Sequence, residues 1–95
     1  MIEKDGDRFY LHGPVTLGNV LEVLAEGERL FHESHVLVDL SRVTEADSSV
    51  LSLMLEWSRT RRTKGGAIEF ANLGEAITSL TDLYGVAELI PRAAE

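Results

Sequence analysis

The chain has 95 residues, 44% of them hydrophobic, which suits a single domain over residues 1–95 with one core. Its net charge of −7 argues against binding nucleic acid or an anionic membrane through the overall field, because phosphate-rich partners would be repelled. Cysteine is absent, which excludes a disulfide scaffold and a thiolate metal site. No apolar run has the length of a signal-peptide core or a membrane span, so we expect a soluble cytoplasmic protein that does not insert into a membrane.

The amino-terminal segment predicts a β-hairpin. A Gly-centred turn, Asp5-Gly6-Asp7, separates residues 1–4 from residues 8–15, whose side chains alternate in character with a period of two. We expect Pro14 to end the second strand, because proline cannot donate to a sheet.

A first helix is expected from Thr16 to about Phe31. Its large apolar residues recur at intervals of three, four and seven, which predicts one buried stripe. Thr16 is a candidate for its amino-terminal cap, and Gly18 and Gly27 weaken the helix. The stripe consists of Leu17, Val20, Leu21, Leu24 and Phe31.

The middle of the chain predicts a strand, a loop and a second helix. Residues 36–40 are apolar apart from Asp39, which favours a strand that is buried on both faces. The oxygens of Asp47-Ser48-Ser49 can accept the free backbone N–H groups of a first helical turn. We therefore expect a helix over residues 48–63 that stops before Gly65-Gly66.

The last third of the chain predicts a strand over residues 67–71, a helix over residues 75–84 and a short element over residues 86–90. The order β-β-α-β-α-β-α indicates an α/β fold with right-handed crossovers. Its sheet should be mixed and mostly parallel, with four or five strands and the hairpin at an antiparallel edge. The buried side of the third helix should consist of Ala76, Ile77, Leu80, Leu83 and Tyr84.

The second helix is more apolar than a one-sided surface helix. At about 100° per residue, its large apolar side chains spread over roughly 200°. Part of this surface should lie outside the core as a candidate interface, although the first or third helix could cover it instead. The residues concerned are Val50, Leu51, Leu53, Met54, Leu55 and Trp57.

The hydroxyl pair Ser48 and Ser49 has three readings. The first is plain capping, and the second is a phosphorylation switch, because a phosphate at a helix amino terminus meets free N–H groups and the positive end of the dipole. The third is a nucleophilic serine, which would need a nearby base. No sequence argument places a histidine near Ser48, and no Gly-x-Ser-x-Gly turn exists, so we do not expect an enzyme. The histidines are His12, His32 and His35.

Metal and cofactor sites are not expected. Asp39 and Asp47 could pair as magnesium ligands, but Asp47 fits a cap and Asp39 the end of a strand. The basic residues between Arg59 and Lys64 could touch phosphate or lipid headgroups, or could form a solvated helix end that complements the dipole. Gly65-Gly66 is not followed by the Lys-Ser/Thr of a phosphate loop.

Two neighbouring segments resemble the core motif of STAS domains, the family of anti-sigma factor antagonists and sulfate-transporter tails. They are Val38-Asp39-Leu40-Ser41-Arg42-Val43-Thr44 and Asp47-Ser48-Ser49-Val50-Leu51, and the resemblance covers about residues 8–91. Further segments look like the MlaB-type subunit of the lipid-asymmetry ABC transporter. These are Asp39-Leu40-Ser41-Arg42-Val43, the basic end of the second helix, Leu83-Tyr84-Gly85-Val86 and Leu89-Ile90-Pro91-Arg92.

The MlaB-type resemblance implies a non-catalytic cytoplasmic protein without a cofactor, peripheral to an inner-membrane transporter that maintains outer-membrane lipid asymmetry. Its partner would be the ATPase subunit, and Ser48 would be the position that carries function. The antagonist branch implies instead a serine kinase as partner and a phosphorylated Ser49, although Val50 stands where that branch usually has glycine. The partner-binding or regulatory residues expected on this basis are Asp47, Ser48, Ser49, Leu51, Leu55, Trp57 and Arg59.

Overall fold

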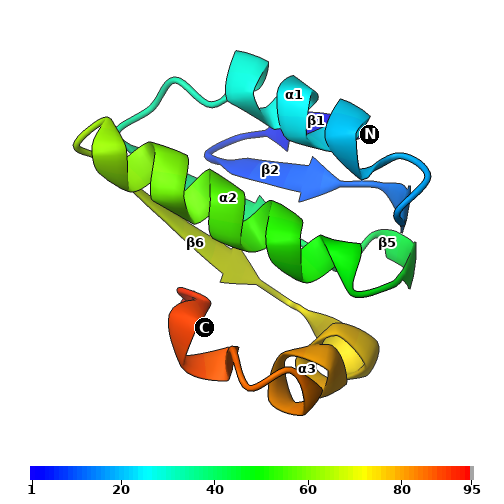
Figure 1. The fold of residues 1–95 in the computed structure, drawn as a ribbon. Coiled ribbons are helices and arrows are strands. Elements are labelled where there is room, and N and C mark those ends of the chain that lie inside the picture. The colour runs from blue at the N-terminus through cyan, green and yellow to red at the C-terminus, as the bar shows by residue number, and fades with distance from the viewer. Residues whose placement is uncertain (95) are drawn as a thin grey trace.

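The computed structural model, which describes residues 1–94, confirms an α/β fold with a mixed, mostly parallel sheet (Figure 1). The main sheet has the strand order β1-β2-β4-β6, in which β1 is antiparallel to β2 and the other pairs are parallel. A second, two-stranded sheet pairs β3 with β5. The elements are β1 (Ile2–Asp5), β2 (Arg8–Leu11), β3 (Gly13–Val15), α1 (Val20–Leu30), β4 (His35–Asp39), β5 (Val43–Ala46), α2 (Ser49–Thr63), β6 (Ala67–Ala71), α3 (Gly74–Leu83) and the 3₁₀ turn η1 (Ala87–Leu89).

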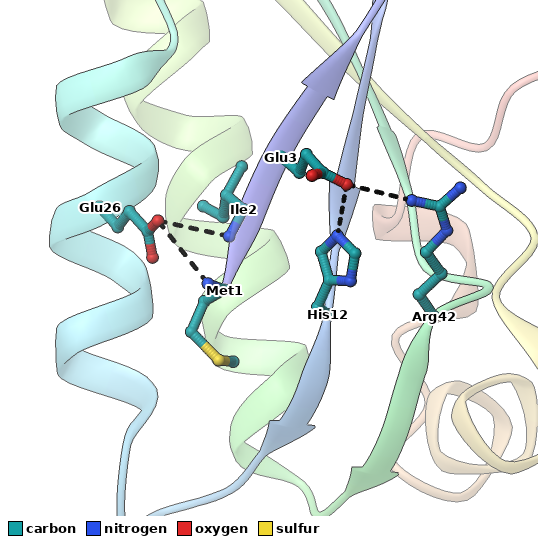
Figure 2. Close-up of polar contacts among 6 residues, drawn as sticks. All are labelled: Met1, Ile2, Glu3, His12, Glu26 and Arg42. Carbon is teal, nitrogen blue, oxygen red and sulfur yellow. Dashed lines mark hydrogen bonds and ion pairs between the residues drawn. The ribbon is translucent and has the colours of Figure 1, made fainter.

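The predicted hairpin is present and is fixed to its neighbours by polar contacts (Figure 2). The Ile2 N–H donates to the Glu26 carboxylate of α1 at 3.3 Å. On the same strand, one oxygen of Glu3 lies 3.1 Å from His12 Nε2 and 3.4 Å from Arg42 Nη1. These contacts join β1 to helix α1 on one side and to Arg42, the residue before β5, on the other.

The small sheet of β3 and β5 is absent from the sequence prediction. Pro14 lies inside β3 rather than ending β2, and the pairing register shifts between Gly13 and Pro14. Proline is tolerated at such an irregularity because it disturbs few ladder hydrogen bonds there. Strand β5 is mostly exposed, so it lacks the apolar alternation that marks a half-buried strand.

The helices α1 and α2 lie side by side on one face of the main sheet (Figure 1). Alternate strand residues point to this layer and are buried: Phe9, Leu11, Val36, Val38, Ile68 and Phe70. On the opposite face Tyr10, Leu37 and Glu69 remain half-exposed. The expectation that strand 36–40 is buried on both faces is therefore wrong at Leu37, which is half-exposed.

The apolar surface of α2 belongs to the core. Trp57 is 1% exposed, its ring packs edge-on against Phe31 with centroids 5.0 Å apart, and its Nε1–H donates to the Leu24 carbonyl at 3.2 Å. Helix α1 can approach this closely because Gly27 faces the indole, where a Cβ would lie 2.4 Å from a ring carbon. The prediction of an exposed apolar run on α2 is therefore wrong except at Leu55, which is half-exposed, and the alternative that α1 covers this surface is confirmed at Trp57.

Helix α1 begins later than expected, at Val20, and Thr16 is not its cap. The residue before the helix is Asn19, whose side chain accepts the Thr16 N–H at 2.9 Å and donates to the Pro14 carbonyl at 2.8 Å. The predicted buried stripes are also partly wrong, because several of their residues are exposed. The stripe residues that are exposed are Leu17 and Leu21 near the start of α1, and Ala76, Leu83 and Tyr84 around α3.

Candidate functional site

The junction between β5 and α2 is organised by Asp47. Its Oδ1 accepts the Ser49 N–H at 2.9 Å and the Ser49 hydroxyl at 2.5 Å, while its Oδ2 accepts the Leu17 N–H at 3.0 Å. The hydrogen bond from the Ser49 hydroxyl, followed by that from Leu17, lowers the pKa of the Asp47 carboxyl. Asp47 therefore stays ionised, satisfies one free N–H of the first turn of α2, and ties that turn to the segment that enters α1.

The two hydroxyls of the predicted pair have different surroundings. Ser49 is half-buried and its hydroxyl is held by Asp47, whereas Ser48 is exposed. Within residues 1–94, the Ser48 hydroxyl has no hydrogen-bond partner. Ser48 is thus the hydroxyl that another molecule can reach without first breaking a contact inside the domain.

The exposed side of α2 continues from Ser48 along the helix. Ser52, Leu55, Glu56 and Arg59 follow at the spacing of one helix face, with Leu55 and Glu56 half-exposed. Arg59 Nε donates to Glu56 at 3.2 Å, and this hydrogen bond lowers the pKa of the Glu56 carboxyl. At 1.5 Å per residue, this face extends roughly 16 Å from Ser48 to Arg59.

The structure divides the predicted site residues into two groups. Asp47, Ser48, Leu55 and Arg59 lie on or beside this helix face, and Ser49 is half-buried at its start. Leu51, which is 5% exposed, and Trp57 point into the core instead, so their assignment to a docking surface is wrong. At about 100° per residue, Trp57 lies on the side of α2 opposite Arg59 and Leu51 lies on the flank of the solvent face, and both side chains are buried.

Sequence reasoning missed two residues beside the site. Leu17 is 80% exposed and Leu21 is 76% exposed, and the backbone of Leu17 is bonded to Asp47. Their spacing from Val20 and Leu24 predicts that they are buried in the core. Spacing alone does not show which residues a neighbouring helix or sheet covers, so this prediction was wrong for both leucines.

A second polar group, around Asp39, is structural. The Asp39 carboxylate lies at the end of β4 and accepts from Arg8 Nη1 at 2.7 Å, Asn72 Nδ2 at 2.9 Å and the Ser41 N–H at 2.8 Å. Burial alone would raise its pKa, but the hydrogen bonds from Ser41, Arg8 and Asn72 together lower it to about 2. Because these donors occupy both oxygens, the arrangement is that of a satisfied buried anion and not of a magnesium site.

Other candidate chemistry finds no support in the part of the chain described. Among residues 1–94 no cluster of three or more His, Asp or Glu side chains could hold a metal, and no helix is both long and apolar enough to span a bilayer. A shallow cavity of about 190 Å³ between β5 and the start of α3 is lined by Glu45 and Glu75 and by no basic residue. Of the basic cluster, Arg61 is not solvated as expected, since its side chain is buried and donates to the Glu33 carbonyl at 2.6 Å.

Comparisons with solved structures give the same fold. The anti-sigma factor antagonist SpoIIAA, in its unphosphorylated form, is 17% identical with a TM-score of 0.74, and the alignment covers 100% of this chain and 88% of SpoIIAA. A sulfate transporter family protein from Wolinella succinogenes is 14% identical with a TM-score of 0.69, over 88% of this chain and 70% of that protein. A structure named Mglu is 27% identical with a TM-score of 0.55, and this chain spans 18% of its length.

A search of curated proteins gave no match. The family model described as "Mlab, STAS domain" matches residues 2–91, which is nearly the whole chain. This match includes both segments that resemble the STAS core motif, and it agrees with the fold shared with SpoIIAA. The chain therefore belongs to the STAS domain family, in its MlaB-type branch.

Proposed function

We propose that this domain is a non-catalytic subunit that binds and regulates the ATPase subunit of a phospholipid-transporting ABC complex. In this role it would be peripheral to the inner membrane and would contribute to outer-membrane lipid asymmetry. The MlaB-type family membership supports this choice of partner class. The geometric observation that carries the proposal is the unpartnered Ser48 hydroxyl at the start of the exposed face of α2.

The first test identifies the partner. The tagged protein is purified from its native host in mild detergent, and the proteins that remain bound are identified by mass spectrometry. Copurification of an ATPase subunit together with a permease subunit is the expected result. Recovery of a serine kinase with no transporter subunit would contradict the proposal.

The second test concerns Ser48 directly. Ser48→Arg should weaken binding of the ATPase subunit at least about tenfold in titration calorimetry, because the bulkier charged side chain would clash with a partner that packs against Ser48 at the rim of the contact. Ser48→Asp should also weaken binding, while a carboxylate at a helix amino terminus favours the fold. Ser79→Arg, which changes an exposed serine on α3, serves as the matched control and should bind within about twofold of the wild type. Normal binding by Ser48→Arg would show that the Ser48 hydroxyl does not belong to the contact.

The alternative function is that of an anti-sigma factor antagonist switched by a serine kinase. The position of Ser49 at the first residue of α2 favours it, because a phosphate there would meet free backbone N–H groups. The same phosphate would, however, lie against the ionised Asp47, which now accepts the Ser49 hydroxyl. Phosphate on Ser49 in protein isolated from cells, together with a bound kinase, would establish this alternative.

A further inference from the structure

Two exposed leucines adjoin the Ser48 face. The backbone already turns helically before α1, since the Val20 N–H donates to the Thr16 carbonyl at 2.9 Å. Leu17 lies in the turn that precedes α1, and Leu21 lies four residues later in the first turn of the helix. Exposures of 80% and 76% make them the most exposed pair of neighbouring large apolar residues near the site. Two such side chains in one place are typical of a contact surface.

This pair is held in a fixed relation to Ser48. The Leu17 N–H donates to Asp47 Oδ2 at 3.0 Å, and the Asp47 N–H donates to the Val15 carbonyl at 3.3 Å. Asp47 immediately precedes Ser48, so one carboxylate connects the apolar pair to the exposed hydroxyl. The leucines and the start of α2 therefore form one continuous surface.

The two segments that form this surface carry acidic residues, of which Glu26 is paired with the amino-terminal ammonium and Glu56 with Arg59. Residues 13–28 and 43–58 contain no lysine or arginine at all, and the cations of both helices begin only at Arg29 and Arg59. A negative field around an apolar centre favours a partner that brings apolar side chains flanked by cations. The acidic residues in the two segments are Glu22, Glu26, Glu28, Glu45, Asp47 and Glu56.

We propose that Leu17 and Leu21 form the apolar centre of the surface that binds the ATPase subunit. The segment of the ATPase that covers them carries apolar side chains flanked by lysine or arginine. This inference rests on the proposed function and adds to it a second contact element, outside α2, and the chemistry of the partner surface.

The test compares two double variants in titrations with the purified ATPase subunit. Leu17→Ser with Leu21→Ser should weaken binding at least about tenfold, because the two serines would no longer bury apolar side-chain area against the partner. Leu83→Ser with Leu89→Ser is the matched control, since these leucines are also exposed, at 78% and 62%, but lie around the end of α3. Its affinity should stay within about twofold of the wild type.

A salt series tests the charge of the partner segment. Raising NaCl from about 50 to about 500 mM should weaken wild-type binding several-fold, because complementary surface charges are screened within a few ångströms at high salt. An affinity that is unchanged or higher at high salt would overturn the basic character assigned to the partner segment. Thermal unfolding of all variants, followed by Trp57 fluorescence, checks that they are folded.

The outcomes separate the two proposals. If the ATPase binds the wild type and the Leu17/Leu21 variant equally, or if the control variant loses as much affinity, the apolar centre is overturned while the proposed function stands. If the wild type does not bind the ATPase, the proposed function is wrong, and the assignment of the ATPase as the partner that covers the leucines is wrong with it. Light scattering could also show a wild-type dimer that is lost in the Leu17/Leu21 variant while the affinity for the ATPase is unchanged. In that case the leucines would bind a second copy of the chain, and the inference would be overturned.

Discussion

Replacing Asp39 by asparagine should destabilise the domain in a way that depends on pH. The Asp39 side chain is 2% exposed and accepts hydrogen bonds from three separate segments: from Arg8 on β2, from Ser41 after β4 and from Asn72 after β6. Asparagine keeps the size of the side chain but removes the charge and turns one acceptor into a donor. At least one of the three donors then loses its acceptor, and the Arg8 guanidinium loses its anion.

The size of the effect follows from the pKa. The pKa of the Asp39 carboxyl falls from 3.8 to about 2 on folding, and 1.36 kcal/mol per pH unit gives a contribution of about 2 kcal/mol. Because the pKa is lower in the folded state, this contribution is complete above about pH 5 and is lost as the pH falls from about 4 through 2. Near pH 7 we expect Asp39→Asn to lower the free energy of unfolding by about 2–3 kcal/mol, since one partner of a buried pair is removed.

Urea unfolding followed by the fluorescence of Trp57 measures this directly, because Trp57 is buried and is the only tryptophan in the chain. The wild type and Asp39→Asn are compared at pH values from 7 to 2. The difference between their free energies of unfolding should narrow by about 2 kcal/mol over this range. Asp82→Asn, which changes an exposed carboxylate on α3, is the control and should differ from the wild type by less than about 0.5 kcal/mol at pH 7.

Two results would refute the reasoning. If Asp39→Asn were as stable as the wild type near pH 7, the hydrogen bonds of the carboxylate to the three segments would not stabilise the fold. If the difference were large but independent of pH, the effect would come from packing or geometry and not from the ionisation of Asp39.

Two further predictions concern helix contacts. Gly27→Ala should destabilise the domain by about 1–3 kcal/mol in urea unfolding, because the new Cβ would overlap the buried Trp57 ring and this cost exceeds the gain in helix propensity. Gly18→Ala is the control, because a Cβ there would make only an ordinary contact with the Thr16 hydroxyl at 3.6 Å. Asp47→Ala should lower the urea concentration at the midpoint of unfolding and speed hydrogen exchange of the Leu17 amide, which loses its acceptor. Unchanged protection of that amide would show that this hydrogen bond does not form in solution.

Much of the fold follows from local patterns in the sequence. The strands over residues 35–39 and 67–71 and the helix over residues 49–63 lie within one or two residues of their predicted bounds, and the hairpin is present although its second strand ends at Leu11 and not at Val15. These elements carry strong signals: a Gly turn, short apolar runs and oxygens before a helix. The β3 and β5 strands carry none, because they are three and four residues long and are held mainly by each other.

The candidate site was predicted only in part, because periodicity identifies apolar faces but not what covers them. In α2 the apolar face is wide, yet Gly27 lets α1 approach closely enough to bury Trp57. In α1 the spacing of Leu17 and Leu21 is that of a core stripe, yet no element lies over them. Burial depends on neighbours that are distant in sequence. For this reason α2 buries apolar residues that were predicted to be exposed, and the start of α1 exposes leucines that were predicted to be buried. The polar residues at the start of α2 depend less on such neighbours, since a cap acts on its own helix, and this is why Asp47 and Ser48 lie at the predicted helix start, while their role in binding a partner stays a prediction.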